Sequence, residues 1–166
     1  MKKIIVRCAV LALFLAALPL AAQSGAWTAV GSTGTVDEAS LAIHAVNTNN
    51  LTFLGASTGT VVARYNVTNT FGGGITDAPP WTTLQMSYFD IAATSSVSAT
   101  LLRLNNCSNV LNVICGVASV DALAPACVSC NFPAGSINFA TGSYVVEVRL
   151  SRTAAALPQL FSLRIF

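Results

Sequence analysis

The segment from Ser143 to Arg152 reads Ser-Tyr-Val-Val-Glu-Val-Arg-Leu-Ser-Arg and decides the fold class of the chain. Residues two apart lie on the same face of a β-strand. One face of this segment therefore collects Tyr144, Val146, Val148 and Leu150, and the other collects Val145, Glu147, Arg149 and Ser151. An apolar face opposite a more polar one is typical of a strand that covers a core on one side and meets water on the other.

The same two-residue period recurs along the chain. We expect strands over 60–67, 83–91, 96–104, 110–118 and 160–166, and shorter ones over 27–30, 41–46, 51–55 and 136–139. About eight to ten short strands without crossover helices predict an all-β fold, an antiparallel β-sandwich. A jelly-roll-like arrangement is favoured over an immunoglobulin-like one, because two distant cysteines around a buried Trp are missing.

Two segments are too rich in Gly or Pro for a central strand. Residues 71–81 contain three glycines followed by two prolines, which predicts a long loop between two strands. Residues 120–133 contain two prolines and two cysteines, which predicts a second irregular loop.

The first 22 residues predict a secretory signal peptide. A basic start, Met1–Arg7, precedes an apolar run from Cys8 to Leu20 and the small residues Ala21 and Ala22. This order is that of an export signal, and the run is shorter than the roughly 20 residues of a transmembrane helix. We expect cleavage after residue 22, a single domain over 23–166 without a membrane span, and a secreted or periplasmic bacterial protein. An uncleaved membrane anchor is the alternative.

Export changes the charge of the chain. Residues 1–22 carry three of the eight basic residues, so residues 23–166 hold five arginines, no lysine and six acidic residues, a net charge of −1. A chain without a basic patch cannot hold phosphates, so no nucleic-acid partner is expected. Ser, Thr and Asn must supply the polar surface, which suits a wet sheet face or packing against copies of the chain or a cell envelope.

Four cysteines follow the signal segment: Cys107, Cys115, Cys127 and Cys130. An even number in an oxidising compartment predicts two disulfides, and the sequence leaves their pairing open. A four-thiolate zinc site and a redox-active C-x-x-C motif are the alternatives. Both are less favoured, because prolines flank the C-x-x-C motif and the spacing of Cys107 and Cys115 is not that of a zinc knuckle.

Candidate catalytic groups are few. His44 is the single histidine and lies on an expected strand, where a hydrogen-bonded histidine is favoured over a catalytic base. The acidic residues are scattered, and the adjacent Asp37 and Glu38 would point in opposite directions on a strand. No Gly-x-Ser-x-Gly motif and no phosphate-binding loop occurs. Neither enzyme activity nor a cofactor or metal is therefore expected.

The aromatic residues are the remaining indication of a binding site. Trp81 ends the Gly- and Pro-rich loop and Asp77 lies within it, so these two are the candidate binding residues. For Trp81 itself, core packing is slightly favoured over ligand contact. Tyr65, Tyr88 and Tyr144 fall inside expected strands, where packing in the core with satisfied hydroxyls is favoured over a sugar-stacking platform.

The stretch from Pro80-Trp81-Thr82-Thr83-Leu84, through Tyr144-Val145-Val146-Glu147-Val148, to Phe166 resembles a type of small exported β-sandwich from environmental bacteria. That type has a Tyr- and Val-rich strand near the end, a Ser/Thr/Ala turn and a final strand. The resemblance implies the fold and no assigned activity.

Three hypotheses for function follow. The first is a non-catalytic binding or surface-associated module that recognises a glycan or a protein at the cell surface. The second is a structural subunit that self-associates through uncharged sheet faces or terminal strands. The third, least favoured, is a hydrolase.

Overall fold

The structure is a computed structural model that describes residues 25–74 and 77–166; the predicted signal peptide, residues 1–22, lies outside the described residues. The strands of the described part are β1 (Trp27–Val30), β2 (Thr35–Val36), β3 (His44–Val46), β4 (Leu51–Phe53), β5 (Gly59–Val67), β6 (Thr83–Asp90), β7 (Ser95–Asn105), β8 (Leu111–Ala118), β9 (Ala122–Asn131), β10 (Gly142–Arg152) and β11 (Gln159–Ile165). Short 3-10 helices occur at η1 (Gly31–Thr33), η2 (Glu38–Ser40) and η3 (Phe71–Gly74).

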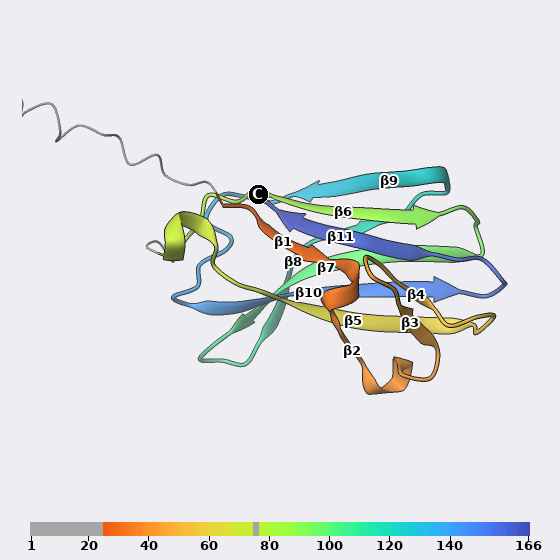
Figure 1. Cartoon of the computed structure of the whole chain (residues 1–166). Coiled ribbons are helices and arrows are strands. Elements are labelled where there is room, and N and C mark those ends of the chain that lie inside the picture. The colour runs from red at the N-terminus through yellow and green to blue at the C-terminus, as the bar shows by residue number, and fades with distance from the viewer. Residues whose placement is uncertain (1–24, 75–76) are drawn as a thin grey trace, which may run out of the picture.

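The strands form two antiparallel sheets that pack face to face. One sheet has the order β3-β4-β11-β6-β9, with β1 also paired to β11, and the other has the order β2-β5-β10-β7-β8. Figure 1 shows β9, β6 and β11 along one side of the molecule and β10 and β5 along the other. The predicted all-β, antiparallel, jelly-roll-like β-sandwich is confirmed.

Strand β10 lies at the centre of its sheet, paired with β5 on one side and β7 on the other. Its predicted apolar face is buried in the core between the sheets, through Tyr144, Val146, Val148 and Leu150. Removing such side chains from water contributes roughly 1.5–3 kcal/mol each. The strand that decides the fold class in the sequence therefore also provides the middle of the core.

The three tyrosines pack in the core with satisfied hydroxyls, as predicted. The Tyr65 hydroxyl donates to the Gly31 carbonyl at 2.6 Å. The Tyr88 hydroxyl donates to the Val120 carbonyl at 3.2 Å and accepts from its N–H at 3.1 Å. The Tyr144 hydroxyl bonds to the backbone of the turn that precedes β10. These hydrogen bonds offset the desolvation cost of burying the hydroxyl groups.

Replacing Tyr65 with Phe is expected to lower the free energy of unfolding by about 1 kcal/mol, because the Gly31 carbonyl loses its donor. Burial raises the pKa of Tyr65 above its ordinary value of 10. The folded state therefore holds this proton more tightly than the unfolded state, and the resulting stability is complete below about pH 10 and declines above it.

Denaturant unfolding of both proteins between about pH 8 and pH 11 measures this effect. The alkaline loss of stability should be smaller in Tyr65→Phe than in the unmodified protein. Equal losses in the two proteins would assign the alkaline transition to another group.

Two expectations about secondary structure are wrong. The irregular loop expected over 120–133 is mostly strand β9, which pairs only with β6 at the end of its sheet. Pro125 is tolerated there because an edge strand leaves one side of its backbone unpaired and because the register shifts between Tyr88 and Asp90. Residues 136–139, expected as a short strand, instead form part of the turn that bonds to Tyr144. The connection from β5 to β6 contains η3 and the irregular residues 77–82, in line with the loop expected there.

Arg152, the last residue of β10, lies on the buried face with 1% of its surface exposed. Its guanidinium donates to the carbonyls of Ser57, Gly55 (2.5 Å) and Ala156 (2.6 Å). Its Cζ also lies 4.5 Å from the centre of the Phe53 ring. This arginine therefore joins the turn between β4 and β5 to the connection between β10 and β11.

Asp90, at the end of β6, is a second buried charged residue. Its two carboxylate oxygens accept hydrogen bonds from the hydroxyls of Ser95 and Ser119, each at 2.5 Å. The Ser119 hydroxyl in turn accepts from the Val97 N–H at 2.9 Å. The carboxylate thus ties the end of β6 to the start of β7 and to the residue that follows β8.

Cys115 on β8 and Cys130 on β9 form a disulfide. Because β8 and β9 are terminal strands of different sheets, the bond closes one side of the sandwich covalently. Cys107 and Cys127 carry free, exposed thiols, so one of the two expected disulfides is present. Cys127 and Cys130 lie three residues apart on β9 and therefore point to opposite faces, and only Cys130 packs against the core. The zinc alternative loses two of its four ligands to the disulfide.

Candidate functional site

His44 lies at the start of β3. Its Nδ1 is 3.2 Å from the backbone oxygens of both Ser40 and Leu41. The ring is held by main-chain groups rather than by a carboxylate or a nucleophile, which confirms the interpretation as a hydrogen-bonded strand histidine.

Two carboxylates take part in an ion-pair network on the solvent side of β5 and β10. Arg64 lies 3.3 Å from an Asp37 oxygen and 3.0 Å from a Glu147 oxygen, and Arg149 lies 2.8 Å from the other Glu147 oxygen. The hydrogen bond to Asp37 is the main reason why the pKa of Arg64 is raised. Exposed pairs of this kind contribute little to stability. Within residues 25–74 and 77–166, no group of three or more His, Cys, Asp or Glu residues is placed to hold a metal ion.

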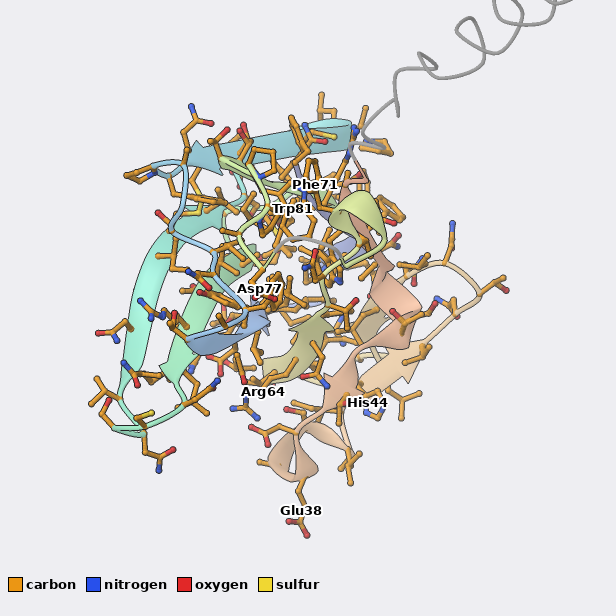
Figure 2. The ribbon with its side chains drawn as sticks, turned by 90° about the vertical axis from the view of Figure 1, so that its left-hand side faces the viewer. Glu38, His44, Arg64, Phe71, Asp77 and Trp81 are labelled. Carbon is orange, nitrogen blue, oxygen red and sulfur yellow. A yellow bond between two sulfur atoms is a disulfide. The ribbon has the colours of Figure 1, made fainter. Side chains whose placement is uncertain are left out.

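Trp81 lies two residues before β6 and is 3% exposed, so its ring belongs to the core. Its Nε1 donates to the Gly25 carbonyl at 3.1 Å, and its ring meets Phe139 edge-on with centroids 6.3 Å apart. Asp77 is exposed, and its backbone carbonyl accepts from the Phe139 N–H at 2.7 Å. Figure 2 shows Trp81 beside Phe71 and well away from His44.

The edge of Trp81 that remains accessible faces a pocket of about 340 Å³. We call it the aromatic pocket; its lining residues are Ala26, Phe71, Pro80, Trp81, Arg164 and Phe166. The Phe166 side chain is 41% exposed, and the Arg164 guanidinium carbon lies 4.6 Å from the centre of its ring. The pocket therefore combines apolar ring surface with one cation.

The backbone of Phe166 is fixed although its side chain is exposed. Its carbonyl accepts from the N–H groups of Thr82 and Thr83 at 2.9 and 3.0 Å, and its N–H donates to the Thr83 carbonyl at 3.1 Å. The pocket wall is thus held by the same ladder that joins β11 to β6. A wall held in this way can bind a ligand with little ordering cost.

A second hollow of about 410 Å³ lies between β1 and β5. Its polar lining consists of Thr28, Thr33, Thr35, Arg64 and Asn66. Strand β1 pairs only with β11, and β2 covers β5 only at two residues, so this crevice separates two incompletely covered sheet edges. It offers hydroxyl and amide groups, but its aromatic residues, Trp27 and Tyr65, are buried. We call it the polar crevice.

Sequence reasoning identified Trp81 but not the other residues of the aromatic pocket. Phe71, Arg164 and Phe166 come from segments that are far apart in the chain and meet only in the folded sandwich. The available signal was weak: Phe71 borders the same Gly- and Pro-rich loop as Trp81, while Phe166 looks like the end of an ordinary strand. Asp77 is not one of the lining residues.

No family profile and no curated protein matches the sequence. Solved structures match the fold. A xylan-binding module, CBM15, superposes with a TM-score of 0.53 at 14% identity, over 85% of this chain and 95% of that module. A glycosylation-associated protein complex (Gap123) from Streptococcus agalactiae superposes with a TM-score of 0.50 at 8% identity, over 84% of this chain and 25% of that one. At these identities the likenesses show a shared β-sandwich fold. Among the described residues, no helix has the length and apolar character needed to cross a membrane.

Proposed function

We propose that this protein is an exported, non-catalytic glycan-binding module whose ligand occupies the aromatic pocket. The observation that carries the proposal is the pocket itself, whose lining includes Phe71, Trp81 and Phe166 together with one arginine, Arg164. The fold shared with a xylan-binding module supports the same class of ligand. The ion-paired acidic residues and the backbone-bound His44 favour binding over catalysis.

The chemistry of the pocket suits a sugar ring. Sugars present C–H groups on one face, which pack on aromatic rings, and hydroxyls at their edges, which need hydrogen-bond partners. Phe166 supplies an accessible ring, and the adjacent Arg164 supplies up to five N–H donors without an acceptor role. Because Arg164 is the single charged residue of the pocket, the site accepts neutral or acidic sugars and disfavours cationic ones.

Replacing Phe166 with Ala should weaken glycan binding about tenfold, which corresponds to roughly 1.4 kcal/mol. The reason is the loss of the accessible stacking surface, while the backbone bonds of residue 166 to Thr82 and Thr83 remain. Affinity electrophoresis against a panel of soluble neutral and acidic polysaccharides identifies the ligand, and isothermal titration calorimetry then measures the affinity of each variant.

Two controls define the site. Phe166→Tyr keeps the ring and should retain most of the affinity, and Asn66→Ala in the polar crevice should leave it unchanged. Loss of binding in Asn66→Ala with normal binding in Phe166→Ala would move the ligand to the polar crevice. Failure of the unmodified protein to retain any polysaccharide would refute the proposed function itself.

Export is part of the proposal. The Cys115–Cys130 disulfide supports it, because such bonds persist in oxidising compartments. The mass of the protein recovered from periplasm or culture medium should correspond to a chain that starts at residue 23, within a few residues. Recovery of the uncleaved chain from the membrane fraction would count against it.

A further inference from the structure

Among the arginines of the described chain, Arg164 alone has a guanidinium without a polar partner. Arg64 and Arg149 are ion-paired with carboxylates. Arg152 donates to three backbone carbonyls, and Arg103 donates to a threonine hydroxyl at 3.0 Å. In the part of the chain that the structure describes, the contact of Arg164 is with an aromatic ring instead. Its five N–H donors are therefore available to a ligand.

The sheet face around Arg164 presents neutral polar groups. Thr28 on β1 and Gln85 on β6 are its register partners. Ser129 on β9 in turn pairs with Gln85. Register partners carry their side chains on the same face of a sheet, so hydroxyl and amide groups flank the guanidinium. The one acidic residue within β1, β6, β9 and β11 is Asp90, which is buried and bonded to two serines. These strands therefore leave the positive charge of Arg164 without a neutralising carboxylate.

The Phe166 ring holds this charge at the aromatic pocket. The Arg164 guanidinium carbon lies 4.6 Å from the centre of the ring, which is the distance of a cation–π contact. The backbone of Phe166 is bonded in turn to Thr82 and Thr83. A ligand that meets this wall pays little to order it. A sugar in the pocket therefore lies beside a guanidinium whose position is already set.

We propose that the glycan recognised in the aromatic pocket is acidic, and that the carboxylate of a uronic acid pairs with Arg164. The inference rests on the proposed function, because it assigns the class of sugar to the same pocket. A guanidinium presents two parallel N–H groups that match the two oxygens of one carboxylate. A sulfate ester has a third oxygen for which this pair of donors offers no partner, so the carboxylate is the better match.

The test uses polymers that differ in charge but not in backbone stereochemistry. Polygalacturonate, alginate and hyaluronate are each compared with the same polymer after reduction of its carboxyl groups to primary alcohols. At least one uronate polymer should bind the unmodified protein about tenfold more tightly than its reduced form does. Isothermal titration calorimetry measures both affinities. The preference should shrink as sodium chloride rises from about 0.05 M to about 0.5 M, because salt screens an exposed ion pair.

Three variants assign the preference to Arg164. Arg164→Gln removes the charge and should abolish the preference for the uronate form. Arg164→Lys keeps the charge without the planar pair of donors and should retain only part of it. The matched control is Arg149→Gln, which makes the same change in net charge at an exposed arginine on β10 of the other sheet and should keep the full preference.

The outcomes separate this inference from the proposed function. Equal affinity for both forms of every polymer, or a preference that survives in Arg164→Gln, would overturn the acidic ligand and leave glycan binding itself intact. Tighter, Arg164-dependent binding of dextran sulfate than of every uronate polymer would overturn the carboxylate. Binding to none of the polysaccharides, acidic or neutral, would instead refute the proposed function. The salt dependence is measured on the unmodified protein, so it decides the question even where a variant fails to fold.

Discussion

Replacing Arg152 with Ala is expected to lower the free energy of unfolding by about 3 kcal/mol or more. The side chain donates to three backbone carbonyls and packs on Phe53, and it is almost fully buried. Hydrogen bonds from a charged donor are worth about 1.5–3 kcal/mol each, and carbonyls that lose their donor in a buried site keep their desolvation cost. Chemical denaturation of the purified variant measures the loss.

The variant Arg152→Lys distinguishes the contribution of the positive charge from that of the planar guanidinium group. Lysine keeps the charge but cannot serve three carbonyls with a planar fork, so this variant should recover only part of the stability. Arg149→Ala is the matched control, because Arg149 lies on the same strand with its side chain in solvent and should change stability by less than about 1 kcal/mol. Equal losses in the free energy of unfolding for Arg149→Ala and Arg152→Ala would show that the buried hydrogen bonds to the carbonyls do not contribute more than an exposed ion pair.

Removing the Cys115–Cys130 disulfide should cost about 3 kcal/mol, the value expected for a closed loop of roughly 15 residues. The double variant Cys115→Ser and Cys130→Ser avoids leaving one half of the pair as an unpaired thiol. Its thermal midpoint should fall by several degrees relative to the unmodified protein. Because β8 and β9 belong to different sheets, the loss should also appear as faster hydrogen exchange in both strands.

The control for this prediction is the pair Cys107→Ser and Cys127→Ser, which removes the two exposed free thiols and leaves the disulfide. It should unfold at the same temperature as the unmodified protein. If both double variants were equally destabilised, the effect would come from side-chain packing rather than from the covalent link.

Much of the fold could be predicted from the period of the side chains. Strand β10 was identified over nearly its whole length because alternate residues separate cleanly into two faces. The same alternation places the Arg152 side chain on the buried face of β10. Charged residues are almost never buried unless they are paired, so the apolar face was expected to end at Leu150. Its acceptors, in the β4–β5 turn and before β11, are not visible in the local sequence.

Strand β9, in contrast, could not be predicted from the local sequence. Pro125 argues against a central strand, and only the sheet order reveals that β9 is terminal, where proline is permitted. The disulfide pairing was also inaccessible, because it depends on which terminal strands of the two sheets face each other. The aromatic pocket was not predicted: of its residues only Trp81 was a candidate, since Phe71 and Phe166 are brought to it by the fold rather than by local pattern.

The position of the disulfide makes the two open sides of the sandwich unequal. On the β8 and β9 side the sheets are fastened to each other, whereas on the side of the polar crevice β1 and β5 face each other across a gap. Local opening of the native state should therefore begin with separation of the two sheets at the polar crevice. The disulfide should keep β8 and β9 together during this opening. Proteases that act on transiently opened chains should cut first near β1 and β2, well before the segment between Cys115 and Cys130.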